Sequence, residues 1–198
     1  MFNFWFRNLL VAATALFVGY SAGANTPAIE ITNAVISMQQ DAAFSDVETM
    51  ALNWKIGDSL SYKIAIGFFK GTAVVSVKEE VTEGFWLNQA IEISNQKMDA
   101  QMLIDKNTGR TLKLIVNGKE ETPPDPNDIE LIDMKEDRIT VTAGTFDCIH
   151  IRARNKKDKK EINQWANPRD LPVTGVLKSI APSQFGNVTM ELTSFRKN

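Results

Sequence analysis

The sequence predicts a mostly β protein, built as a single strongly curved antiparallel sheet or partial barrel of about ten strands with at most one N-terminal helix. From Gly57 onward, apolar and polar residues alternate with period two, the pattern of strands that bury one face. Turn signals separate these segments without intervening helical patterns, which favours antiparallel neighbours. A single helix covers little apolar surface, so the sheet is expected to curl, with a two-sheet sandwich as the alternative.

Residues 1–24 are predicted to be a cleavable secretory signal peptide. Arg7 precedes an apolar run from Leu9 to Val18, and small residues close the segment at Ala22-Gly23-Ala24. This run is shorter than the roughly 20 apolar residues that span a membrane, so no transmembrane segment is expected in the mature chain. We therefore expect a periplasmic or secreted protein, cleaved near Ala24.

The remaining chain is expected to hold one domain. Residues 25–53 form a lead-in, partly helical or flexible, in which Asn33 is a candidate helix cap and the apolar spacing is loosely helical. Residues 54–198 form the antiparallel β domain. After loss of Arg7 the chain has 21 basic and 24 acidic residues, a balance that gives no support to a nucleic-acid partner. Its single cysteine allows no internal disulfide, so stability is expected to come from packing.

The alternation places the strands in chain order. The first covers residues 59–68, with its even-numbered apolar residues on one face. Later strands are expected at 73–77, 85–93, 112–116, 129–134, 139–143, 145–154, 161–165, 175–180 and 188–195. Asn117-Gly118 is a strong hairpin signal, Asp105–Gly109 reads as a tight turn, and Thr122–Asp128, with three prolines, reads as a rigid corner.

Cys148 and His150, the only cysteine and the only histidine, raise the question of a nucleophile pair. They are two residues apart on one strand, so both side chains project to the same face with backbones ~6.5–7 Å apart. A productive thiol–imidazole pair needs hydrogen-bond contact and usually a third residue that orients the base. We therefore expect structural roles for both residues, no catalytic site and no enzymatic activity.

The sequence also contains no recognisable metal or cofactor site. One histidine cannot build a histidine-rich zinc site, and Asp125–Asp137 departs from a calcium loop at Ile129 and Glu130. The basic run Arg152–Lys160 is expected to be a soluble hairpin tip, with contact to an anionic surface as the alternative. Trp165–Gly175 reads as a loop that either buries the tryptophan or forms the lip of a pocket.

Several motifs together resemble a group of exported bacterial proteins of unknown function. They are Trp54–Asp58 followed by Tyr62, the stretch Val141–Cys148, and Trp165 with Asn167-Pro168 and Leu171–Val173. The group shares a W-x-x-G-D strand and an AGTF-[DE]-C strand. More remotely, the predicted sheet is similar to the half-barrel of periplasmic lipoprotein carriers, whose concave face holds acyl chains. This likeness concerns the fold, and no functional residue is transferred from it.

The leading hypothesis is a non-enzymatic periplasmic protein that binds an apolar ligand, such as a lipid, or an apolar part of an envelope component on the concave face. The predicted lining consists of Tyr62, Ile64, Ile66, Phe68, Val75, Leu87, Ile91, Leu112, Leu114, Trp165, Met190 and Leu192. The alternative is an envelope protein–protein interaction module with a fully packed core. A hydrolase with an unrecognised carboxylate pair is a third hypothesis.

Overall fold

The computed structural model describes residues 11–12, 43–44, 52–123, 128–183 and 185–198. Six strands of the main sheet precede residue 122: β3 (Ser59–Ile66), β4 (Phe69–Glu80), β5 (Gly84–Ile93), β6 (Gln96–Asp105), β7 (Thr111–Val116) and β8 (Lys119–Glu121). Five follow residue 128: β9 (Ile129–Val141), β10 (Gly144–Asn155), β11 (Glu161–Ala166), β12 (Val176–Ser183) and β13 (Gly186–Arg196).

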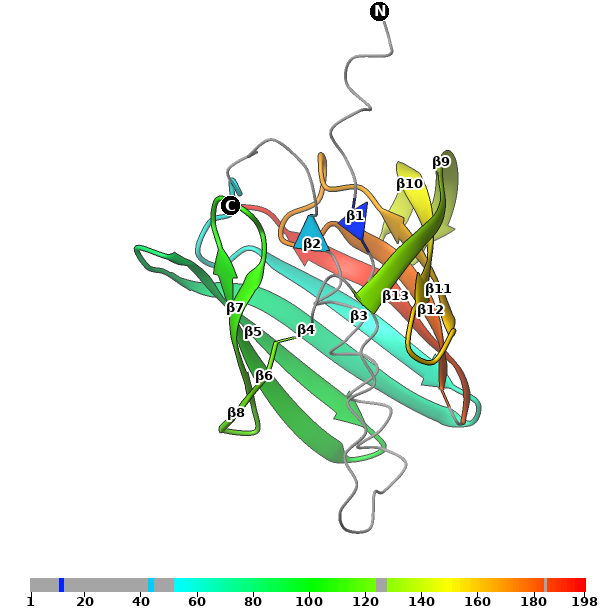
Figure 1. Cartoon of the computed structure of the whole chain (residues 1–198), viewed down its shortest axis with the longest axis horizontal. Helices are drawn as coiled ribbons and strands as arrows, with labels where there is room; N and C mark the ends of the chain where they lie inside the picture. Colours follow the sequence, from blue (N-terminus) through cyan, green and yellow to red (C-terminus); the bar gives the residue numbers. More distant parts are fainter. Residues whose placement is uncertain (1–10, 13–42, 45–51, 124–127, 184) are drawn as a thin grey trace, which may run out of the picture.

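These eleven strands form one antiparallel sheet in the order β8-β7-β6-β5-β4-β3-β13-β12-β11-β10-β9 (Figure 1). All neighbours along this order are consecutive in the chain except β3 and β13, which pair from Val188 opposite Ile66 to Arg196 opposite Ser59. The two runs of hairpins therefore meet in the middle of the sheet. The predicted fold class is confirmed.

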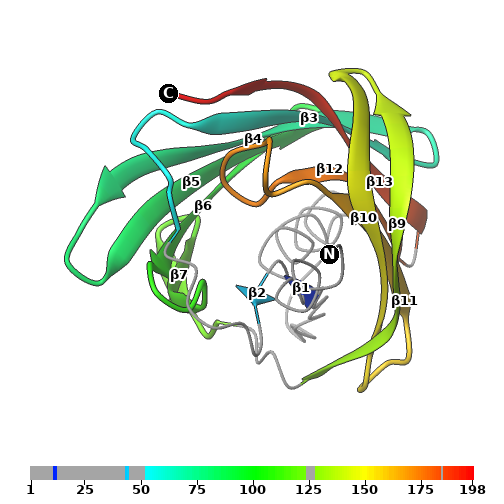
Figure 2. The same ribbon diagram turned by 90° about the horizontal axis from the view of Figure 1, so that it is seen from above.

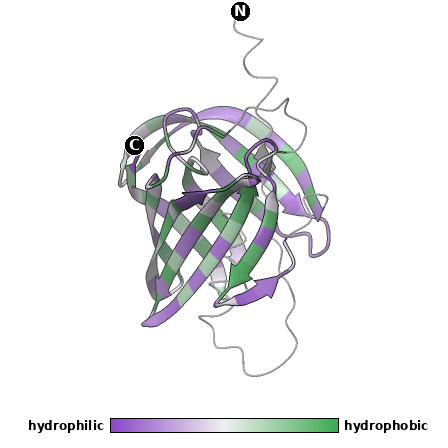
Figure 3. Cartoon of the chain, turned by 90° about the vertical axis from the view of Figure 1, so that its left-hand side faces the viewer, coloured by the Kyte–Doolittle hydropathy of each residue, from purple (hydrophilic) through white to green (hydrophobic). Residues whose placement is uncertain are grey.

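The sheet is strongly curved and remains open. Seen from above, its strands follow an arc with β6 and β7 on one side and β9 to β11 on the other (Figure 2). β8 and β9 are the two edges and do not pair with each other. Hydrophobic and hydrophilic residues alternate along the strands, as Figure 3 shows, and the buried residues of this alternation form one hydrophobic cluster on the concave face.

Two differences from the sequence prediction concern strand boundaries. The segments expected at 129–134 and 139–143 are one continuous strand, β9, and β6 and β8 were not among the expected strands. The middle of β9, from Lys135 to Arg138, is exposed. β9 is an edge strand, and edge strands tolerate charged residues because one of their sides is unpaired. The apolar alternation of β9 is therefore interrupted in the middle, although its pairing with β10 continues.

The expected Asn117-Gly118 hairpin is present between β7 and β8. Both residues have positive φ, 50° and 79°, as a type I′ turn requires. The Asn117 side chain also accepts a hydrogen bond from the Asp99 backbone N–H on β6, at 3.1 Å. The turn signal in the sequence therefore identifies both the loop and its backbone conformation.

The N-terminal predictions fall mostly outside the described residues. Within 1–51 the structure describes only β1 (Val11–Ala12) and β2 (Ala43–Phe44), which pair with each other. The predicted leader and most of the lead-in, expected to be partly helical or flexible, lie outside the described residues, as does the centre of the Thr122–Asp128 corner. Across the described part of the chain there is no helix, and hence none with the length and hydrophobicity of a membrane span.

Candidate functional site

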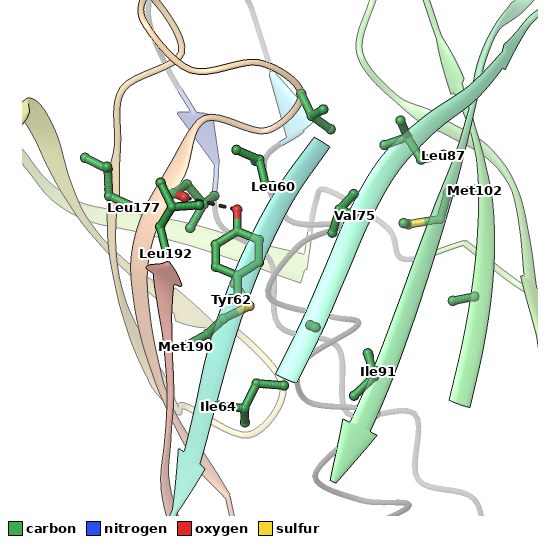
Figure 4. Close-up of a cluster of buried hydrophobic side chains, with 14 of the residues drawn as sticks. Leu60, Tyr62, Ile64, Val75, Leu87, Ile91, Met102, Leu177, Met190 and Leu192 are labelled. Atoms are coloured by element: carbon green, nitrogen blue, oxygen red, sulfur yellow. Dashed lines mark hydrogen bonds between the residues drawn. The ribbon is translucent and has the colours of Figure 1, made fainter. Parts of the chain in front are cut away.

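The concave face of the sheet is the candidate functional site. Nine of the predicted lining residues lie there, each no more than 6% exposed: Tyr62, Ile64, Ile66, Val75, Leu87, Ile91, Leu114, Met190 and Leu192. In the close-up of Figure 4, the labelled side chains of β3, β4, β5, β6, β12 and β13 project to the same side of the sheet. The period-two pattern thus identified one continuous apolar surface.

Cross-strand pairing makes this surface continuous through the centre of the sheet. Ile64 on β3 lies opposite Met190 on β13, and Tyr62 lies opposite Leu192. On the other side of β3, Leu60 lies opposite Val75 of β4. Directly opposed side chains of this kind are the units that stabilise a sheet.

Several buried residues of the same face were not in the predicted lining. They are Leu60, Ile93, Met102, Ile151, Leu177 and Val188. For Met102 the signal was present, because Met98, Ala100, Met102 and Ile104 recur with period two along β6, although Leu103 interrupts the polar residues between them. This signal is weak, since alanine and methionine mark a buried face less clearly than isoleucine or valine.

Three predicted lining residues lie elsewhere, and the structure corrects their placement. Phe68 is fully exposed, because Gly67 and Phe68 form the turn between β3 and β4, where strand alternation ends. Leu112 is 47% exposed, since a register shift pairs Ile104 with Thr111 and Leu103 with Lys113, leaving Leu112 without a partner. Trp165 projects to the opposite face from buried Gln164 along β11, where its ring stacks on His150 and is partly buried against the core cluster.

The segment Asn167–Gly175, here called the capping loop, folds toward the concave side between β11 and β12 (Figure 2). The Asn167 side chain holds it by donating to the Asp147 carbonyl at 2.9 Å and accepting from the Asp170 N–H at 2.9 Å. The loop buries Leu171 and Val173 in the core cluster. Trp165 itself is partly buried and packs against the same cluster.

Tyr62 connects the capping loop region to the centre of the sheet. Its hydroxyl donates to the Val176 carbonyl at 3.0 Å (Figure 4), and its side chain is 1% exposed. Burial raises the pKa of Tyr62 well above its ordinary value, so the hydroxyl stays protonated and can donate at any physiological pH.

The W-x-x-G-D motif forms a turn that leads into β3. Gly57 has a φ of 91°. The Asp58 carboxylate accepts hydrogen bonds from the Lys55 N–H at 2.9 Å and from the Asn198 N–H at 2.8 Å. This buried acid therefore joins the start of the domain to its C-terminal residue. It is the only carboxylate among the buried residues of the described chain.

Cys148 and His150 have separate hydrogen-bond partners. The Cys148 thiol donates to the Asp137 carbonyl at 3.5 Å. The His150 ring stacks on Trp165 with centroids 4.2 Å apart and pairs with the Asn163 side-chain oxygen at 3.1 Å. Burial, followed by nearby Asp137 and Asp147, raises the pKa of Cys148 to about 11, so the thiol is a poor nucleophile at neutral pH.

We expect iodoacetamide to alkylate Cys148 much more slowly in the folded protein than in denaturant. A pKa of about 11 leaves only ~0.1% of the thiol ionised at pH 8, and the side chain is also buried. The measurement is the alkylation rate by mass spectrometry between pH 7 and 10, which should rise with pH throughout. Equal rates in the folded and denatured protein at pH 8 would instead indicate an activated thiol.

The basic run Arg152–Lys160 is largely paired with acids. Arg152 and Arg154 both contact Glu161, at 3.3 and 2.5 Å, and their hydrogen bonds lower the pKa of that carboxyl. Lys157 contacts Asp128 at 2.5 Å. These ion pairs fit the expected soluble hairpin tip between β10 and β11. In the described ranges, no group of three or more His, Cys, Asp or Glu side chains is arranged to hold a metal ion.

Comparison of the sequence with known protein families and with curated proteins finds no match. Among solved structures, an exported protein with a YmcC-like fold from Bacteroides fragilis is 13% identical, with a TM-score of 0.42 over 75% of this chain and 100% of that one. The hypothetical protein CT021 from Chlamydia trachomatis is 12% identical, with a TM-score of 0.46 over 73% and 89%. MucB in the Pseudomonas aeruginosa MucA/MucB complex is 11% identical, with a TM-score of 0.40 over 72% and 52%. At these TM-scores the similarity supports no conclusion about function.

Proposed function

We propose that this protein is a non-enzymatic binding protein of the cell envelope, which holds an apolar ligand or an apolar part of an envelope component on the concave face of its sheet. The observation that carries the proposal is the continuous apolar face of a sheet whose edges, β8 and β9, do not close. An unclosed concave apolar surface is a typical site for such ligands. The predicted signal peptide supports an envelope location.

The capping loop and the start of the domain lie along one rim of this surface, where both contact C-terminal residues: Lys197 donates to the Arg169 carbonyl at 3.2 Å and Asn198 to the Asp58 carboxylate at 2.8 Å. Leu171 and Val173 pack into the core cluster on the β11–β12 side. On the β5–β6 side, the Leu52 N–H donates to the Lys106 carbonyl at 3.1 Å, and Trp54 packs on Phe85 with ring centroids 5.6 Å apart. A ligand is therefore expected to lie below this rim, against β3, β4 and β13.

The test is binding of the fluorescent fatty acid cis-parinaric acid to the purified mature protein. Wild type is expected to bind the probe and to gain about 2.7 kcal/mol of stability at a probe concentration a hundredfold above Kd. Ile66→Trp and Leu114→Trp add bulk to the concave face, so probe binding should weaken at least tenfold. Val74→Trp is the matched control, since Val74 is exposed on the outer face of β4.

A filled core gives a different result. In that case wild type binds no probe, and Leu114→Trp only overpacks the interior, which costs roughly 1–3 kcal/mol of stability. Denaturation midpoints of all variants, measured beside the binding curves, separate the two results. Absence of binding together with simple destabilisation would contradict the proposal.

The second candidate function is protein recognition through the outer surface, with a fully packed core. Three exposed phenylalanines favour it: Phe68 and Phe69 at the β3–β4 turn, and Phe185 at the β12–β13 turn. The two turns are neighbours, because the Phe185 carbonyl oxygen lies 3.7 Å from the position a Cβ would take at Gly67. Exposed aromatic residues gathered in this way are common at protein interfaces. A negative fatty-acid result would leave this function as the better one.

A further inference from the structure

Three polar side chains lie inside the apolar concave face without a hydrogen-bond partner. Gln89 on β5, Gln164 on β11 and Ser179 on β12 are each 0% exposed. The side-chain nitrogen and oxygen of both glutamines and the Ser179 hydroxyl are unpaired. Buried polar groups are paired in the great majority of proteins, because leaving one unpaired is unfavourable. These residues therefore need an explanation that apolar packing does not provide.

Strand register places all three on the face described above. Gln89 is two residues from both Leu87 and Ile91 and lies opposite Val75 on β4. Gln164 lies opposite Ser179, and Ser179 lies opposite Met190 on β13. The unpaired groups thus point in the same direction as the apolar lining.

The two glutamines lie on opposite sides of the curve. β5 and β11 face each other across the arc in Figure 2, and five strand steps separate them in the sheet order. At ~4.8 Å a step, the path along the sheet is about 24 Å. A ligand that pairs with both glutamines must carry polar groups at two well-separated points of an otherwise apolar body.

We infer that the concave face binds an extended, apolar polypeptide segment of another protein, whose backbone amides pair with Gln89 and Gln164. A glutamine side chain offers both a donor and an acceptor, and a peptide bond is the complementary group. An extended chain presents unpaired N–H and C=O groups toward both sides along its whole length, whereas a helix uses them internally. This inference rests on the proposed function, for which it names the ligand class.

An acyl chain fits the same apolar surface but does not account for the glutamines. Its polar atoms lie at one end, so it can pair with one side of the curve only. A charged head group is also disfavoured, because the buried polar residues of the described chain include no lysine or arginine. A neutral ligand with repeated amides satisfies both sides.

The experiment compares two apolar peptide probes that differ in their backbone N–H donors. The first is a fluorescein-labelled, end-capped decapeptide of alternating valine and alanine. The second is the same peptide with every alanine nitrogen methylated, which keeps the side chains and replaces half of the N–H donors by N-methyl groups. Fluorescence polarisation with the mature wild-type protein is expected to show binding of the first peptide and at least tenfold weaker binding of the second.

The double variant Gln89→Leu/Gln164→Leu tests the residues themselves. We expect it to bind the unmethylated peptide at least tenfold more weakly than wild type and to bind both peptides alike. Folding should be preserved, because replacing an unpaired buried polar group by an apolar one of similar size is neutral or stabilising. Asn88→Leu is the matched control. Asn88 lies between buried Leu87 and Gln89 and therefore projects to the outer face of β5, so this substitution should leave peptide binding unchanged.

Binding of cis-parinaric acid separates failure of this inference from failure of the proposed function. If wild type binds the fatty acid but neither peptide, the inference is overturned and the proposed function stands. If it binds neither probe, both are overturned. If wild type and the double variant bind the two peptides equally well, buried water satisfies the glutamines and their role in recognition is overturned. Loss of peptide binding in the double variant with fatty-acid binding intact supports the inference.

Discussion

Tyr62→Ala is expected to lower the free energy of unfolding by about 3–5 kcal/mol, the cost of removing a large buried aromatic side chain. Tyr62 lies in the middle of β3, is 1% exposed and packs among the residues shown in Figure 4. The substitution also leaves the Val176 carbonyl without its donor. Urea denaturation followed by circular dichroism measures the effect.

Tyr62→Phe separates the two contributions. It keeps the ring and removes only the hydroxyl, so it should cost about 1–3 kcal/mol, the penalty for a buried acceptor left unpaired. If Tyr62→Phe were as stable as wild type, the hydrogen bond to Val176 would contribute nothing. If Tyr62→Ala cost less than Tyr62→Phe, Tyr62 would not be the buried centre of the face.

Gly84→Ala is expected to destabilise the protein by about 3 kcal/mol or more, at the upper end of overpacking costs. A Cβ at Gly84 would lie 1.8 Å from the Ile104 carbonyl oxygen. The obstacle is backbone and cannot rotate away, so β5 and β6 must separate at the pair Gly84–Asp105. Because β5 carries Leu87, Gln89 and Ile91, we expect weaker ligand binding as well.

Gly118→Ala is the control for this substitution. Gly118 has nothing within 4 Å of a built Cβ but has a φ of 79°, so alanine there should cost about 1 kcal/mol or somewhat more from backbone strain alone. Thermal denaturation of both variants gives the comparison. A Gly84→Ala cost no larger than that of Gly118→Ala would contradict the close approach of β5 and β6.

The sequence predicted the strands whose two faces differ most. Along β3, Leu60, Tyr62, Ile64 and Ile66 are buried and the residues between them are not, because a local period of two determines which side chains share a face. The Asn117-Gly118 turn was equally predictable, since its backbone conformation depends on the two residues themselves. Local chemistry was sufficient in both cases.

Prediction was less accurate where pairing changes the local pattern. Phe68 continues the alternation of β3 in the sequence, but the chain turns one residue earlier. Leu112 continues that of β7, but a register shift leaves it without a partner. Trp165 ends the strand expected at 161–165 and was placed in the concave lining, but along β11 it alternates with buried Gln164. In each case the local pattern of apolar residues does not show where the chain turns or how the neighbouring strand pairs.

The sequence alone determined that this chain forms an antiparallel sheet with one apolar face, because period-two alternation and turn residues act over a few positions. Only the tertiary structure decided that β3 pairs with β13, that the sheet stays open between β8 and β9, and that Gln89 and Gln164 are buried without partners on opposite sides of the curve. Strand order and curvature arise from contacts between residues far apart in the chain. The position of a polar residue in an alternating segment also does not show whether its side chain will find a hydrogen-bond partner in the folded protein.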